Sequence, residues 1–280
     1  MKRRLVAIIS ALLLSALVVA GYWLLATQSG LQTSIKFTQK AVDGLQIGKA
    51  NGRLYDGLIL KDIRYAPAAG PQIEIGEIDG RWQLWSILTG RFMVSQLHIS
   101  KLQINLIDTK DEPVPDNQER FQLALPVGLH IRSLRISDAR LTPTNGDSQL
   151  LFDRLDSALR LSHDRLTLSS FNLIRPDLAA TLVGDVQFSG DYRTNLNYGL
   201  NINHPQWGAI NATATISGDL QKMTLRQQLG EPFASEQIIT MSNLLDDPKW
   251  RLLVEGESWT LGQLIDGQAG HLEKFSVSGT

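Results

Sequence analysis

Histidines are the first residues to consider for chemistry, because imidazole is both a metal ligand and a general base. The chain has five of them, and no two lie at the spacing that a metal pair needs. No His-Glu-x-x-His sequence occurs either. We therefore expect the histidines at the surface or at strand edges, and the sequence predicts no metal and no other cofactor. The five are His98, His130, His163, His204 and His271.

Carboxylates and nucleophiles give no better case for catalysis. The acidic stretch Asp108–Glu119 contains two prolines and no apolar period, which is typical of a solvated loop. The chain has no Gly-x-Ser-x-Gly elbow and no glycine-rich phosphate loop. It also has no cysteine, which excludes thiol chemistry and disulfides. The sequence predicts that the protein is not an enzyme.

The charge balance narrows the classes of partner. Lys and Arg number 27 and Asp and Glu number 28, so the formal net charge is -1. A chain without a basic surplus is not expected to bind nucleic acid. The hydrophobic content of 43% is ordinary for a folded protein. The basic group at residues 2–4 is explained by membrane topology. It consists of Lys2, Arg3 and Arg4.

The stretch 5–26 has no charge and no proline. As a helix it would be about 33 Å long, enough to cross a bilayer core. The basic residues before it would stay in the cytoplasm and the rest of the chain would emerge on the other side. A cleaved signal peptide ending near Ala20 is the alternative, but the apolar run is longer than such peptides have. The membrane-anchor residues would include Leu5, Leu14, Val18, Trp23 and Leu25.

The periodicity of apolar residues predicts the elements that follow. Residues 27–44 have helical spacing, which favours a short juxtamembrane helix that lies on the membrane, caps the first strands or simply connects. From residue 45 the period becomes two, which predicts a first β module over 45–107, interrupted by a short helix at 82–89. A polar loop is expected at 108–120, and further strands over 121–280.

Two turns in the second half are nearly identical, Phe188-Ser189-Gly190-Asp191 and Ile216-Ser217-Gly218-Asp219. A third, Val277-Ser278-Gly279-Thr280, stands at the end of the chain. This loose repeat of strand, turn and strand predicts an elongated antiparallel sheet. It also suggests that these residues are the front part of a longer protein, truncated at the C-terminus.

Each strand has one apolar face, and that face must be covered. A closed sandwich is one solution. The other is a curved, taco-like groove open to lipid acyl chains, which burial would stabilise by about 0.8 kcal/mol per methylene. The neighbouring anchor favours the groove. Its expected lining is Leu166, Leu168, Leu196, Tyr198, Leu200, Ile202, Ile210, Ile216 and Leu225.

Several stretches resemble one family. They are Thr27-Gln28-Ser29-Gly30-Leu31, the segments 44–52 and 58–65, the stretch 82–89 leading to Leu97-His98-Ile99, and Asp246-Asp247-Pro248-Lys249-Trp250 with its continuation through 261–264 and 270–272. Together the sequence resembles the amino-terminal part of the translocation and assembly module subunit TamB, within the AsmA-like superfamily.

The resemblance implies a single-pass inner-membrane protein whose bulk lies in the periplasm of a Gram-negative bacterium. It implies an apolar β-groove that holds or conducts phospholipids toward the outer membrane. It also implies an outer-membrane barrel partner of the TamA type, met through a C-terminal region expected outside these 280 residues. The alternative is an anchored scaffold that assists the assembly of outer-membrane proteins through exposed strand edges.

Overall fold

The computed structural model describes residues 15, 19–67, 70–106, 127–143, 149–231, 234–245, 247–260 and 271–279. The basic residues Lys2, Arg3 and Arg4 and the anchor residues Leu5, Leu14 and Val18 lie outside this part. Residues 19–26 are helical and include Trp23 and Leu25. Within the described residues, no helix is both long and apolar enough for a membrane crossing.

Helix α2, Gln28–Ala41, follows directly. It begins where the Thr27 hydroxyl accepts a 3.0 Å hydrogen bond from the Gly30 amide, which satisfies one of the free amides of the first turn. Gly30 is buried because its Cα packs against the preceding helical residues, and a Cβ there would lie 2.3 Å from the carbonyl oxygen of Leu24. The glycine therefore allows the chain to turn sharply between residue 26 and α2.

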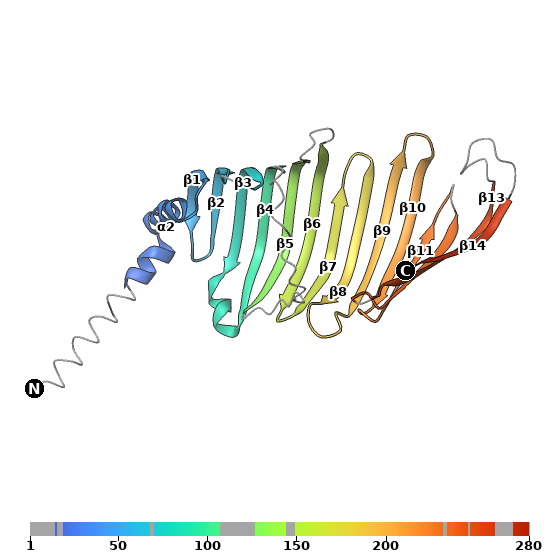
Figure 1. Ribbon diagram of the computed structural model, residues 1–280. Coiled ribbons are helices and arrows are strands. Elements are labelled where there is room, and N and C mark those ends of the chain that lie inside the picture. Colours follow the sequence, from blue (N-terminus) through green and yellow to red (C-terminus); the bar gives the residue numbers. More distant parts are fainter. Residues whose placement is uncertain are drawn as a thin grey trace, which may run out of the picture. The chain divides into compact units, whose positions relative to one another are not determined.

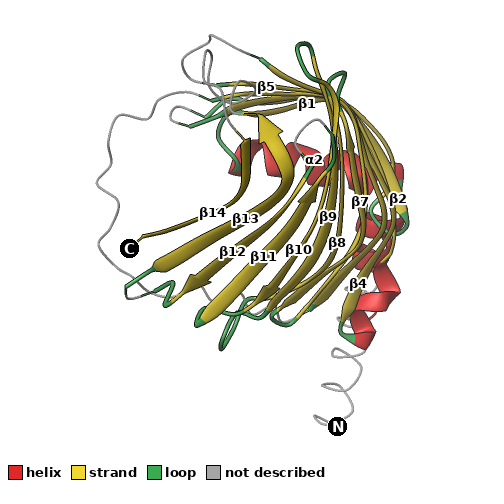
Figure 2. Cartoon of the chain, turned by 90° about the vertical axis from the view of Figure 1, so that its right-hand side faces the viewer, coloured by secondary structure: helices red, strands yellow, loops and turns green. Residues whose placement is uncertain are grey.

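The chain divides into two compact units, Met1–Pro115 with Arg135–Leu151, and Asp116–Leu134 with Phe152–Thr280. The structure describes fourteen strands, and strands adjacent in sequence are hydrogen-bonded neighbours. All the described registers are antiparallel, and Figure 1 shows the strands in chain order. Figure 2 shows the loops of the second unit at the ends of its strands. The protein is thus mainly β, as predicted, with short helices only near the start of the described chain.

The first unit begins with β1 Leu45–Arg53, β2 Gly57–Tyr65, β3 Gln72–Gln83, the 3₁₀ helix η1 Leu84–Thr89 and β4 Arg91–Asn105. The next strands are β5 Gly128–Thr142 and β6 Leu150–Ser162, each with residues in both units. The second unit continues with β7 Arg165–Ile174, β8 Leu178–Gln187, β9 Thr194–His204, β10 Gly208–Gly218, β11 Lys222–Leu229, β12 Ser235–Ser242, β13 Lys249–Thr260 and β14 His271–Gly279.

The short helix expected at 82–89 begins two residues later, at Leu84, and is a 3₁₀ helix. Trp82 and Gln83 still belong to β3, where they pair with Val94 and Met93 of β4. Only residues 84–89 turn, as a 3₁₀ helix, and Gly90 ends it with a φ of 74°. The strand continues because the Trp82 indole donates a 2.8 Å hydrogen bond to the Leu54 carbonyl, which holds the residue against the β1–β2 turn.

One irregularity runs across the first four strands. The paired residues skip one position in each strand, from Ile47 to Lys49 in β1 and from Ile63 to Lys61 in β2. The skipped residues of β2 and β4, Asp62 and Lys101, have left-handed backbones with φ of 57° and 54°. Because every strand takes its extra residue at the same level, the register is kept and the strands can bend together.

Few side chains are buried. The described apolar residues in the core are Leu31, Ala50, Ile63, Val94, Ile131, Ala212, Ala214 and Val254. A two-layer sandwich would bury most of its inward-facing leucines and isoleucines. Within the described residues, element contacts join strand neighbours, α2 with β1, and η1 with β4. Neither a helix nor a second sheet is described over either face, so the closed sandwich is not what these residues form.

Candidate functional site

The strand registers decide which predicted lining residues share a face, because paired residues of antiparallel strands point to the same side. One rung crosses eight strands from β6 to β13. It runs through Leu159, Leu168, Gly184, Leu196, Ile216, Leu225, Ile239 and Leu252. Apart from one glycine, every member is a leucine or isoleucine, so the rung forms a continuous apolar line.

The other predicted lining residues fall on the same face. Leu166 lies two residues before Leu168 on β7, so both side chains point to the same face. Leu166 pairs with Val186. On β9 and β10, Leu200 pairs with Ala212 and Ile202 with Ile210. All nine residues named from the sequence therefore project from one face of the second unit, which we call the apolar face.

Polar side chains occupy the opposite face, here called the polar face. On β9 and β10, Asn201 donates a 2.6 Å hydrogen bond to Asn211, and Thr215 donates one of 2.9 Å to Asn197. Most of the other members on the central strands are polar, although Val183 of β8 shares this face. The polar members include Thr181, Asn195, Asn203, Thr213, Ser217, Thr224, Arg226 and Gln228.

The apolar face is half-exposed. All nine predicted residues have intermediate exposure, while their alanine neighbours Ala212 and Ala214 on β10 are buried. Small residues on β10 let the larger side chains of β9 and β11 come together above it. The face thus has local packing and no covering layer among the described residues.

Tyr198 and Gln227 both place polar groups on this face. The Tyr198 hydroxyl donates a 2.6 Å hydrogen bond to Oε1 of Gln227, across the buried Ala214. Partial burial raises the pKa of the Tyr198 phenol. The tyrosine is therefore uncharged at neutral pH, and its ring keeps the face apolar while the hydroxyl is satisfied.

The first unit shows the same division. The rung Ile47, Ile63, Ile75 and Leu102 is apolar. On the other side, Lys61 forms a 2.9 Å ion pair with Glu77, and Arg64 forms one of 2.6 Å with Glu74. The hydrogen bond and charge of Glu77 raise the pKa of Lys61. Both units thus have one apolar and one polar face.

Two hollows lie on the polar side. One, of about 550 Å³, has Gly199 on its floor and Thr181, Thr213 and Gln228 around it. The other, of about 650 Å³, lies over Gly48 and Gly76 in the first unit. Both are places where glycines leave space between polar side chains, so neither is the predicted acyl-chain groove.

The histidines lie apart from one another. His98 lies 3.2 Å from the Ser137 hydroxyl, and His204 stacks on Trp207 with a centroid distance of 4.2 Å. His163 takes a left-handed turn conformation with a φ of 50°. The described residues contain no group of three His, Asp or Glu side chains that could hold a metal ion. His130 and His271 lie on β5 and β14.

Capping of the first strands was one of the roles expected for the helix at 27–44, but the glutamine side chains that cover the outer edge of β1 were not predicted from the sequence. Gln28 and Gln32 of α2 both donate hydrogen bonds to the Ala50 carbonyl, at 2.8 Å and 2.9 Å. The Gln28 amide oxygen also accepts a 3.0 Å bond from the Gly52 amide. Gln39 reaches the Ile47 carbonyl at 3.4 Å. The spacing of the three glutamines, which puts them on one helix face, is the signal that could have revealed this contact.

One protein family matches the chain in a comparison with known proteins. The family model described as "TamB, N-terminal domain" matches residues 17–145 and, in a second overlapping match, residues 118–261. No curated protein and no solved structure matches the chain. Since the two matches together span most of the sequence, the chain belongs to the TamB family and contains its N-terminal domain.

Proposed function

We propose that the apolar face holds phospholipid acyl chains and lets them move along the sheet toward the outer membrane. One observation supports this most: nine large apolar side chains share one half-exposed face over which the described residues place no layer. A water-exposed apolar area of this kind marks an interaction site in a soluble domain. The proposal includes a groove along the apolar face and assigns the chain no catalytic step.

The proposed setting is the periplasm, with the N-terminal stretch 5–26 as an inner-membrane anchor. Membership of the TamB family supports this setting. The family also suggests an outer-membrane barrel partner of the TamA type, which we place outside the residues of this chain. Lipid would then move from the inner membrane toward that partner.

The second candidate function is a scaffold for outer-membrane proteins, which pairs client strands with an open sheet edge. The edge of β1 is poorly suited to this role, because Gln28 and Gln32 already bind its Ala50 carbonyl and Gly52 amide. This observation counts against strand pairing at the β1 edge of the sheet.

Site-specific photocrosslinking tests the proposal. A photoreactive amino acid at Leu200 or Ile216 samples the apolar face, and one at Asn201 or Ser217 samples the polar face one residue away on the same strands. We expect phospholipid adducts, identified by mass spectrometry, at Leu200 and Ile216 and not at the two control positions.

The outcomes separate the two functions. Equal lipid capture at all four positions, or none, would contradict an acyl-chain site. Adducts to outer-membrane proteins from positions on strand edges, with no lipid adducts at Leu200, would favour the scaffold.

A further inference from the structure

The turn between β3 and β4 exposes large apolar side chains. Trp85 is 64% exposed, Ile87 40% and Leu88 78%. Arg81 precedes this turn and Arg91 follows it, and no acidic residue stands between them in the sequence. We call the segment from Arg81 to Arg91 the tip. A cluster of exposed apolar side chains between two cations is the composition of a segment that lies at a lipid interface.

Hydrogen bonds hold the exposed side chains of the tip in place. The Trp82 amide donates a 3.0 Å hydrogen bond to the Asp56 carbonyl, while the Trp82 indole binds the Leu54 carbonyl. The Met93 amide donates a 2.9 Å bond to the Ser86 hydroxyl. These bonds fix both ends of η1, so the apolar side chains are held outward and cannot fold back onto the sheet without breaking them.

Tyr55 connects the tip to the helical residues that precede α2. Its ring packs edge-on against Trp85 with a centroid distance of 6.1 Å, and its hydroxyl accepts a hydrogen bond from the Trp85 indole. Its amide donates a 2.9 Å bond to the Leu25 carbonyl. The tip and the end of the helical segment 19–26 are therefore joined through one residue of the β1–β2 turn.

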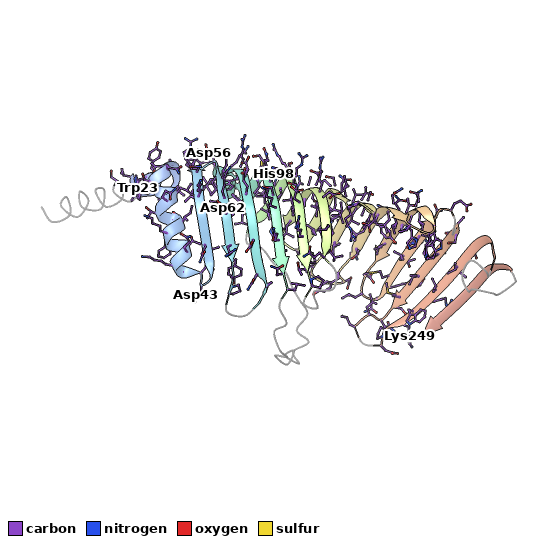
Figure 3. All side chains as sticks on the ribbon, turned by 90° about the horizontal axis from the view of Figure 1, so that it is seen from above. Trp23, Asp43, Asp56, Asp62, His98 and Lys249 are labelled. Atoms are coloured by element: carbon purple, nitrogen blue, oxygen red, sulfur yellow. The ribbon has the colours of Figure 1, made fainter. Side chains whose placement is uncertain are left out.

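The helical segment is itself exposed and apolar. Val19 is 63% exposed, Tyr22 70% and Trp23 44%. Figure 3 shows Trp23 and Asp56, the neighbour of Tyr55, along one side of the first unit, with Asp43 on the other side. This segment is the last part of the apolar stretch 5–26, so the membrane would lie on the side of the first unit where the tip stands.

The geometry points to a second membrane contact: we propose that the tip rests in the surface of the same bilayer that holds the N-terminal stretch. Trp85, Ile87 and Leu88 enter the acyl boundary, where tryptophan is favoured, and Arg81 and Arg91 lie at the level of the lipid phosphates. Arg91 is exposed, and Arg81 lies 3.9 Å from Asp79 with 65% of its side chain exposed. This inference rests on the membrane attachment proposed above.

Two contacts would orient the first unit, whereas a single helix would let it rotate. The tip and the helical segment are separate points of the first unit that both contact Tyr55. With both in the bilayer, the end of the sheet at β1 is held beside the membrane, which is where acyl chains would enter.

Single-cysteine labelling tests the tip, because the chain has no cysteine of its own. The full chain is reconstituted in vesicles of phosphatidylethanolamine and phosphatidylglycerol, and a fluorophore is placed by Thr89→Cys, Val19→Cys or Gln103→Cys. Thr89 is in the tip and leaves the three apolar side chains intact. Gln103 is exposed near the far end of β4, about 40 Å away along the strand. Quenching of the fluorophore by nitroxide-labelled lipids measures how closely each position contacts the bilayer.

We expect the labels at positions 19 and 89 to be quenched about twofold or more above the label at 103. Adding Leu88→Asp to Thr89→Cys should reduce quenching to the level at 103. The unfolding midpoint should not change, because Leu88 is mostly exposed. Quenching at 19 but not at 89 would overturn tip docking and leave the attachment standing. No quenching at 19 or 89 would overturn both.

Discussion

A Cβ atom on Gly184 of β8 would lie 2.0 Å from the carbonyl oxygen of Asn195 on β9. The backbone of Gly184 also has a φ of 138°, which side chains other than glycine rarely allow. Gly184 is the one glycine in the apolar rung between Leu168 and Leu196. The two strands approach closely because this position lacks a side chain, and the apolar line is continuous across it.

Gly184→Ala should therefore lower the free energy of unfolding by roughly 2–4 kcal/mol, from the clash and the backbone strain together. Gly190→Ala is the matched control, since Gly190 also has a positive φ, 61°, but a Cβ added there would have no atom within 4 Å. We expect about 1 kcal/mol there. Denaturant unfolding measures both, and equal losses would show that the close approach has no energetic role.

A charge on the apolar face should block lipid binding without unfolding the protein. Leu200 has alanines as both cross-strand neighbours, Ala180 and Ala212, so a glutamate there has room to reach solvent. We expect Leu200→Glu to reduce co-purifying phospholipid about tenfold, because a carboxylate beside acyl chains is strongly unfavourable. Asn201→Glu, on the polar face, should leave the lipid content as it is. Equal lipid content in the two variants would count against the apolar face as the site.

Removing the cover on β1 should expose a sheet edge. Gln28→Ala with Gln32→Ala deletes both donors to the Ala50 carbonyl, which should cost roughly 1–2 kcal/mol of unfolding free energy. It should also promote self-association, because open edges pair with other chains. Light scattering and denaturant unfolding check this. Lys36→Ala, at an exposed position of α2, should change neither property.

The β6–β7 turn should make the second unit sensitive to acid. Hydrogen bonds from Ser189 and then Gln187 lower the pKa of Asp164 below its ordinary value of 3.8. A lowered pKa stabilises the fold above the unfolded-state value, and this stabilisation is lost as the pH falls through the folded-state value. The melting temperatures of wild type and Asp164→Asn should differ near pH 7 and converge as the pH falls below 3.8. Ser189→Ala should weaken the pH dependence of the melting temperature. Parallel pH profiles for wild type, Asp164→Asn and Ser189→Ala would contradict a role of Asp164 in acid sensitivity.

Much of the fold follows from alternation in the sequence. Strictly alternating runs such as Leu196 to Ile202 form strands because one face is apolar and the other polar, and their phase fixes which residues share a face. The same logic placed all nine predicted residues on one face. Turn sequences helped too: Asp219 accepts hydrogen bonds from the Gln221 and Lys222 amides, as an aspartate after Ser-Gly is suited to do.

Other features depend on contacts that alternation does not encode. The bend at Asp62 and Lys101 appears in the sequence only as a three-residue step between apolar positions, such as Leu60 to Ile63 and Ile99 to Leu102. That step is equally compatible with a helical turn. The start of η1 at Leu84 depends on bonds from Trp82 to the distant residues Leu54 and Asp56. Local periodicity contains no information about such partners.

Because the described strands pair only with their neighbours, a sheet of this kind can gain or lose strand pairs. In the described part of the chain, each strand of β7 to β14 pairs only with those before and after it. Stability in such an array is a sum of local terms, as in repeat proteins. Duplicating or deleting a whole hairpin would therefore leave the remaining interfaces unchanged. Evolution could therefore lengthen or shorten such a sheet in steps of two strands.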